Sequence, residues 1–272
     1  MMRSLWTAAS GMTAQQTNVD LIANNLANVN TAGFKKERME FKSLLYQTMS
    51  RATIDPTTGF VGPSNLQVGL GVRPIATTRI FEMGNLERTE NNLDFAINGP
   101  AFFAIQRNLD TVTYTRDGNF RLSVGDDGLM LVTAEGFPVL GIDDEPIIIP
   151  FDINVATMSV QDDGTLLFRT PEGEIEDLGF QLALVQFPNV QGLEAIGSNL
   201  FIATAASGEP MLESDGETTQ VSTVLQGFIE MSNVQLAEEM VRLIIAQRAY
   251  EINSRAIQAS DEMLQQANNL RR

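Results

Sequence analysis

The chain has 272 residues, a formal net charge of −16, and neither cysteine nor histidine. A chain of this length can bury one large core or two to three smaller ones. The lack of Cys and His excludes disulfides, thiolate or imidazole metal sites, cysteine nucleophiles and Ser-His-Asp catalysis, so most common enzyme mechanisms are ruled out.

The negative charge is concentrated in the middle of the chain. Residues 108–217 contain 20 acidic side chains and three arginines, whereas residues 1–34 are neutral and residues 228–272 have a net charge of −1. Nucleic-acid phosphates are bound by Lys and Arg, so we expect no nucleic acid as a partner. Neutral ends that meet while acidic middles face water would suit a crowded assembly.

Neither a signal sequence nor a membrane span is evident. The N-terminus lacks an apolar core of about 7 to 15 residues, and no run reaches roughly 18 uncharged apolar residues. We expect no membrane insertion and, if the protein leaves the cytoplasm, export by a route without a cleaved signal peptide.

The first predicted element is a long N-terminal helix. Side chains recur at alternating spacings of three and four from Met2 to Leu26, which indicates a heptad seam on a helix of nearly thirty residues, about 40 Å long. Gly33 is a plausible stop. The residues expected to mediate assembly here are Leu5, Met12, Val19, Ile22, Asn24, Asn25, Leu26, Asn28, Gly33 and Phe34.

The asparagines in this helix need an explanation, because Asn is a poor helix former. Asn24, Asn25 and Asn28 could hydrogen-bond across neighbouring copies and set their register, as a buried Asn does in coiled coils. Alternatively, Asn28 and Asn30 cap a fraying helix end. We favour the role in assembly, and the two roles are compatible.

Residues 46–74 are rich in Pro and Gly and follow neither the helix nor the strand period. We predict an extended arm with little local structure, which is either disordered or bound to something. Its free backbone groups and alternate apolar side chains could form a strand-like tie between subunits. The arm residues expected to make that contact are Tyr46, Pro56, Pro63, Leu66, Val68, Leu70 and Val72.

The middle of the chain is predicted to be all-β. Short runs of period two are separated by turn signals such as Asn98-Gly99 and Asp163-Gly164. The predicted strands lie within 95–105, 111–123, 129–133, 147–153, 165–170, 180–187 and 199–204.

The C-terminal region is predicted to be a second long helix, opened by Ser232 or Asn233 as a cap and braced by the pairs Glu238–Arg242 and Glu251–Arg255. A second apolar row beside the heptad positions (Val241, Ile245, Ile252, Ala256, Ala259 and Met263) makes the face broad. The residues expected to mediate assembly are Leu236, Leu243, Gln247, Arg248, Tyr250, Ile252, Asn253, Ile257 and Leu264.

Two alternative functions have weak support. The stretches at 124–129 and 160–165 both contain Asp-Asp-Gly, but they lack the alternating oxygen ligands of a calcium loop, so hairpin turns are favoured. A carboxylate-based glycosidase is possible in principle, but one Trp and three Tyr leave few surfaces for sugar stacking. We therefore expect no enzyme activity, no metal and no cofactor.

The terminal helices point to an assembly. A pair formed by the two ends of one chain would leave much of the broad face at 236–264 uncovered, so other copies are expected to cover it.

Three stretches resemble one protein family. They are "ANNLANVNTAGFK" at 23–35, "YTRDGNF" at 114–120 and "SNVQLAEEMVRLIIAQRAYEINSRAIQASDEML" at 232–264. Together they resemble the rod and hook family of axial proteins of the bacterial flagellum, and the resemblance spans essentially the whole chain. The length and residues 44–74 are most similar to the members that form the distal part of the rod, and next to those of its proximal part.

The resemblance implies an α+β multi-domain fold, in which long N- and C-terminal helices form a coiled-coil-like domain beside an all-β body and an extended arm. The expected domains are 1–34 (N-terminal helix), 35–75 (connecting region with the arm 46–74), 76–220 (outer all-β domain), 221–231 (return connection) and 232–272 (C-terminal helix).

The implied function is mechanical. Copies would assemble helically into the distal part of a rigid hollow rod that transmits torque from motor to hook around an export channel. The implied partners are the chain itself, proximal rod proteins and hook protein at the two ends, surrounding ring proteins and peptidoglycan, and the flagellar export apparatus, in the basal body and periplasm. The alternatives are a proximal rod protein of the same family, or a secreted β-rich adhesin whose helices form a trimerisation stalk; an open helical tube would distinguish the rod from a closed trimer.

Overall fold

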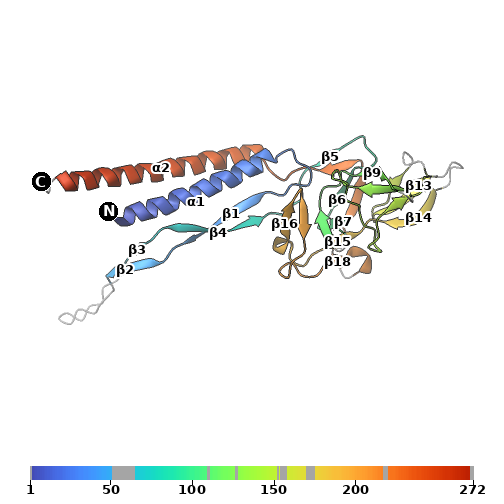
Figure 1. The fold of residues 1–272 in the computed structure, drawn as a ribbon, viewed down its shortest axis with the longest axis horizontal. Helices are drawn as coiled ribbons and strands as arrows, with labels where there is room; N and C mark the ends of the chain where they lie inside the picture. The colour runs from blue at the N-terminus through green and yellow to red at the C-terminus, as the bar shows by residue number, and fades with distance from the viewer. Residues whose placement is uncertain are drawn as a thin grey trace. The chain divides into compact units, whose positions relative to one another are not determined.

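The computed structural model describes residues 2–50, 65–108, 111–125, 128–151, 153, 158–169, 175–216 and 220–269 (Figure 1). The chain divides into two compact units. The helical unit comprises Met1–Ala27, Glu37–Thr78 and Gln235–Arg272, and the β unit comprises Asn28–Lys36 and Arg79–Val234. Within the connecting region expected at 35–75, residues 37–75 therefore cluster with the helices and residues 35–36 with the β unit, and residues 76–78, expected in the outer all-β domain, also cluster with the helices.

Helix α1 (Met2–Ala27) and helix α2 (Leu236–Asn269) pack side by side in the helical unit (Figure 1). They meet along small and polar side chains: Ser4 Oγ lies 3.2 Å from Ser260 Oγ, and Ala8 and Ala246 are buried. A Cβ at Gly11 would lie 2.9 Å from Asn253 Nδ2, so this close approach depends on glycine. Small residues let the two backbones come close together.

The helix boundaries differ from those expected. Helix α1 ends at Ala27, six residues before Gly33. Helix α2 begins at Leu236, so neither Ser232 nor Asn233 caps it. The Asn233 side chain instead accepts a hydrogen bond from the Lys36 backbone N–H and donates one to the Ile80 carbonyl, both at 2.8 Å.

The predicted brace between Glu238 and Arg242 is confirmed, with Arg242 Nη2 2.7 Å from Glu238 Oε1. The second predicted brace is replaced by another pair: Glu251 accepts a hydrogen bond from Arg248 at 3.2 Å.

The prediction of little local structure over residues 46–74 is wrong at both ends of the stretch. Strand β2 (Tyr46–Ser50) pairs antiparallel with β3 (Leu66–Gly69), with Tyr46 opposite Gly69. Strand β1 (Glu37–Ser43) pairs with β4 (Val72–Arg79), and the bonds Leu44 N–H to Gly71 O and Leu70 N–H to Leu45 O join the two pairs into one ribbon. Each strand pairs with its partner along one edge, and the Pro and Gly content concealed this pairing.

Asn25 holds the start of this ribbon against α1. Its Nδ2 donates to the Glu37 carbonyl at 2.8 Å, and its Oδ1 accepts the Glu37 backbone N–H at 3.0 Å. Asn25 is fully buried within its own chain. The expectation that it bonds across neighbouring copies is therefore wrong, because both ends of its amide are used inside the helical unit.

The β unit is built around a six-stranded sheet of order β16-β17-β8-β7-β15-β18. Shorter sheets β11-β10-β9, β12-β13-β14, β19-β6 and β20-β5 complete the unit. The strands are β5 (Leu86–Arg88), β6 (Phe95–Asn98), β7 (Phe102–Asn108), β8 (Thr111–Thr115), β9 (Arg121–Val124), β10 (Leu129–Val132), β11 (Ile148–Ile149), β12 (Ser159–Val160), β13 (Thr165–Arg169), β14 (Ile175–Gln181), β15 (Leu184–Gln186), β16 (Glu194–Gly197), β17 (Leu200–Ile202), β18 (Met211–Leu212), β19 (Thr223–Gln226) and β20 (Phe228–Glu230).

The six-stranded sheet is covered on both faces. Along β7, Phe103 and Ile105 join one buried apolar cluster, whereas Phe102 and Ala104 join a second one. Burial on both faces explains why this strand reads as a continuous apolar run. The middle predicted to be all-β is mostly β: it also contains two 3-10 helices, η2 (Val190–Gly192) and η3 (Glu213–Asp215), and the runs 95–105 and 111–123 each divide into two strands. Residues 221–231, expected to be a return connection, contain β19 and β20.

Replacing Asn25 by Ala should lower the stability of the helical unit by about 2 kcal/mol or more, because it leaves both backbone groups of Glu37 without their partner. The measurement is urea unfolding of the full-length chain followed by its helical circular dichroism. Asn24→Ala, at the exposed neighbouring position, is the matched control. Equal midpoints for the two variants would show that the Asn25 amide contributes nothing specific.

Candidate assembly surfaces

The predicted assembly residues of α1 divide into two groups. Ile22 is buried like Asn25, whereas Asn24 is exposed. The apolar positions Leu5, Met12, Val19 and Leu26, together with Asn28, are partly buried. Gly33 and Phe34 are buried in the β unit. Ser4 and Gly11, which lie against α2, each stand one position before a predicted residue, Leu5 and Met12.

On α2 most of the predicted residues point away from the α1 contact. Leu236, Tyr250 and Ile252 are exposed, as are Gln247 and Arg248. Partial burial is found at Leu243, Asn253, Ile257 and Leu264.

The exposed apolar row of α2 is its most prominent surface. Val241, Ile244, Ile245 and Ile252 are 55–66% exposed, and their spacings of three, one and seven place them on one side of the helix. We call these four residues the α2 outer face. A contiguous apolar surface of this kind marks a contact site.

Sequence reasoning missed several exposed apolar residues. Ile244 and Met240 lie on α2, and Trp6, 74% exposed, lies on α1. For Trp6 a signal was available in the sequence: it is the only tryptophan of the chain, and it lies outside the heptad positions of the predicted helix.

The ribbon also exposes apolar side chains. Tyr46, Leu66, Val68 and Leu70 are exposed, and Val72 is partly buried. Leu45 and Met49, which were not predicted, are exposed as well. Pro56 and Pro63 lie outside the described residues.

A buried ionic cluster in the β unit joins segments distant in the sequence. Lys35 Nζ bonds Glu230 Oε1 and donates to the Glu82 carbonyl at 2.8 Å, and Arg116 Nη1 lies 3.5 Å from Glu230 Oε2. Burial lowers the pKa of Lys35, while the adjacent Glu230 carboxylate acts in the opposite direction. The same two influences act on the pKa of Arg116, with burial again the larger. We call Lys35, Arg116 and Glu230 the ion triad.

The ion triad brings together two of the motifs singled out in the sequence. Lys35 belongs to "NTAGFK" and Arg116 to "YTRDGNF". The Gly33 N–H donates to the Glu230 carbonyl at 2.8 Å. Gly33 has a φ of +67°, and a Cβ there would lie 2.7 Å from the Asp117 nitrogen, so the position requires glycine. The left-handed conformation of Gly33 therefore allows the two motifs to contact each other, and it does not end helix α1.

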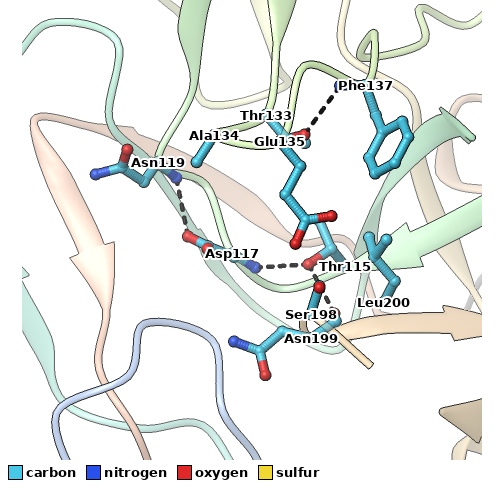
Figure 2. Close-up of a pocket in the computed structure, with 10 residues that line it drawn as sticks. All are labelled: Thr115, Asp117, Asn119, Thr133, Ala134, Glu135, Phe137, Ser198, Asn199 and Leu200. Atoms are coloured by element: carbon cyan, nitrogen blue, oxygen red, sulfur yellow. Dashed lines mark hydrogen bonds between the residues drawn. The ribbon is translucent and has the colours of Figure 1, made fainter. Parts of the chain in front are cut away.

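The "YTRDGNF" loop borders a pocket of about 200 Å³ (Figure 2). Its polar groups are engaged with each other: Thr115 Oγ1 donates to the Asn199 carbonyl at 2.9 Å and accepts the Asp117 N–H at 3.1 Å, and Asp117 Oδ1 accepts the Asn119 N–H at 3.1 Å (Figure 2). Asn199 Nδ2 donates to the Ala32 carbonyl at 2.8 Å. These hydrogen bonds hold the loop in its conformation.

Two further findings concern the described residues only. No helix in the described part of the chain has the length and apolar character that crossing a bilayer requires. Within the same ranges, no three acidic side chains gather closely enough to hold a metal ion.

The chain is similar to known proteins along its whole length. Three family models match its beginning, its middle and its end. Residues 5–35 match the family "Flagella basal body rod protein", residues 96–168 match "Flagellar hook protein FlgE/F/G D1 domain", and residues 225–270 match "Flagellar basal body rod FlgEFG protein C-terminal". The chain is 48% identical to the flagellar basal-body rod protein FlgG of Borreliella burgdorferi, covering 100% of both chains. It is 44% identical to FlgG of Buchnera aphidicola subsp. Schizaphis graminum, with 99% of this chain and 100% of the relative covered. It is 39% identical to FlgG of Bacillus subtilis, with both chains covered completely.

These matches define a structural protein of the bacterial flagellum rather than an enzyme. The chain belongs to the family of flagellar basal-body rod proteins.

Replacing Lys35 by Met should destabilise the β unit by about 3–5 kcal/mol, because it leaves Glu230 buried with a weakened set of partners. Thermal unfolding followed by calorimetry measures the effect. Lys42→Met, at an exposed position of β1, removes the same charge and should be nearly neutral. A Lys35→Met variant as stable as Lys42→Met would show that the ion triad does not hold the unit together.

Replacing Asp117 by Asn should make stability less dependent on pH. Burial raises the pKa of Asp117, so ionising it in the folded chain costs stability as the pH rises above about 4. Asn cannot ionise and keeps an oxygen to accept the Asn119 N–H. In urea unfolding, the free energy of unfolding of the variant should therefore rise relative to that of the parent chain between pH 4 and 8. If this difference became smaller over the same range, the assignment to Asp117 would be wrong.

Proposed function

We propose that this chain is the subunit of the distal flagellar rod, and that copies assemble helically into a rigid hollow shaft. The shaft would transmit torque from the motor to the hook and enclose the export channel. The assembled rod would lie in the basal body and cross the periplasm.

The observation that carries this proposal is the α2 outer face. Val241, Ile244, Ile245 and Ile252 are more than half exposed although they lie on a 34-residue helix. Helix α1 contacts α2 along another seam, which contains Ala8 and Ala246. Another copy of the chain is the simplest cover for these side chains, and identical copies in one helical array would give each chain the same cover.

The contact between the two terminal helices, which we propose to be coiled-coil-like, supports a tube. The α1–α2 contact includes small and polar residues such as Ser4, Gly11 and Ser260, and the α2 outer face stays exposed and free to contact neighbouring copies. If apolar surface remains on the outer sides of each helix pair, further pairs can pack beside it around a channel. A two-helix coil that buried all of its apolar surface would leave none for such contacts. The same reasoning assigns the partly buried Leu5, Met12 and Val19 of α1 to contacts between copies.

The ribbon is proposed as the tie that stiffens the shaft. Strands β2 and β3 pair with each other along one edge only, so both their outer edges and their side chains could contact a neighbouring copy. Tyr46, Leu66 and Val68 are exposed on these paired strands, as an apolar contact would require. Rigid strands that lie across neighbouring copies would resist sliding between them.

The remaining partners follow from a place in the distal rod. Proximal rod proteins and hook protein would meet the two ends of the shaft, and ring proteins and peptidoglycan would surround it. The strongly acidic residues 108–217 all belong to the β unit, which suits a surface that faces water and these surroundings.

Replacing Ile245 by Ser should prevent or strongly reduce polymerisation, because it removes a large exposed apolar side chain from the proposed contact between copies. Sedimentation and electron microscopy of the purified chain, over a series of concentrations, measure the assembly. Val124→Ser removes an apolar side chain that is 75% exposed on β9 of the β unit and is the control. The proposal fails if wild-type chains form only closed oligomers, or if Ile245→Ser polymerises like Val124→Ser.

A further inference from the structure

A hollow in the helical unit contains a buried carboxylate. The hollow has a volume of about 220 Å³ and lies between α1, β1 and the first turns of α2. Gln15, Asn18 and Ile22 of α1, Glu37 of β1, and Glu239 and Ile245 of α2 are among the residues that line it. Only 1% of Glu239 is exposed to solvent.

Both carboxylate oxygens of Glu239 lack a hydrogen-bond donor among the described residues. Arg242 Nη1 lies 3.5 Å from Glu239 Oε1, which is an ion contact without a hydrogen bond. The short bond of Arg242, at 2.7 Å, goes to Glu238 instead. A buried carboxylate without donors is costly in an isolated chain, and adding a cationic donor removes most of that cost.

We infer that the hollow is a socket for a cationic side chain from a second copy of this chain, and that the Glu239 carboxylate at its bottom binds that side chain. A guanidinium or ammonium group offers several N–H donors and a full positive charge, which the two free carboxylate oxygens require. Arg248 and Arg255 of α2 are exposed, so each copy presents cationic side chains of this kind.

The position of the hollow favours a second copy as the source of the cation. Ile245 lines the hollow and also belongs to the α2 outer face, where it is 63% exposed. A chain that covers the outer face therefore also reaches the edge of the socket. This inference rests on the proposed self-assembly and adds a polar contact that sets the register of an otherwise apolar interface.

The test compares three variants of the full-length chain with wild type. Glu239→Gln keeps the shape of the side chain and removes its charge. Glu238→Gln is the matched control, because it removes the same charge one position away, from an exposed side chain that pairs with the same Arg242. Ile245→Ser tests the apolar interface separately. The critical concentration for polymerisation is measured by sedimentation, and helix content by circular dichroism below that concentration.

We expect Glu239→Gln to raise the critical concentration by at least about tenfold, as the loss of a charge-assisted hydrogen bond implies. Glu238→Gln should change it by less than about twofold, as for an exposed pair, and helix content should be unchanged in both. Polymerisation of Glu239→Gln at the wild-type concentration would overturn the socket while leaving the proposed rod intact. Reduced helix content in Glu239→Gln would also overturn it, because Glu239 would then serve its own helical unit through Gln15 or Asn18. Normal polymerisation of Ile245→Ser would instead refute the apolar interface on which both proposals rest.

Discussion

Two helices from opposite ends of one chain pack along a seam of small and polar side chains, and the other features of the helical unit depend on it. Because Gly11 lies against Asn253 and Ser4 against Ser260, the α1 and α2 backbones approach closely along small and polar side chains. The large apolar side chains are left on other sides of the helices. A seam of small residues thus lets the two helices of one chain pack together and at the same time keeps the α2 outer face available to neighbouring copies.

The ion triad gives the β unit a different kind of cohesion. Lys35 lies just before the crossing into the helical unit at residues 36 and 37, and Glu230 shortly before the crossing at residues 234 and 235. Arg116 comes from the loop after β8. Buried charges add little net stability when they are paired, but breaking the pairing is costly. Such an arrangement fixes where these segments lie more than it strengthens the fold.

Asn25 and Glu239 show two opposite ways to place a polar group in the helical unit. Asn25 uses its amide fully within the chain, where it joins α1 to β1. Glu239 is equally buried, but its carboxylate accepts no hydrogen bond from the described residues and has only the 3.5 Å ion contact with Arg242. In a folded chain the first arrangement is complete, whereas the second becomes favourable only when a donor arrives from outside, which is the physical basis of the proposed socket.

The sequence by itself determined the two terminal helices, the all-β middle, the uncovered face at 236–264 and the family, because helix and strand periods and the three motifs are local properties of the chain. It could not show that α1 faces α2 through Ser4, Ala8 and Gly11, since small residues give no apolar signal beside Leu5 and Met12. It also concealed the β2–β3 ribbon, because Pro and Gly mask strands whose hydrogen bonds are made across a long gap in the chain. Only the tertiary structure decided that Asn25 bonds within its own chain and that Lys35 meets Glu230, since both contacts depend on which distant segments become neighbours.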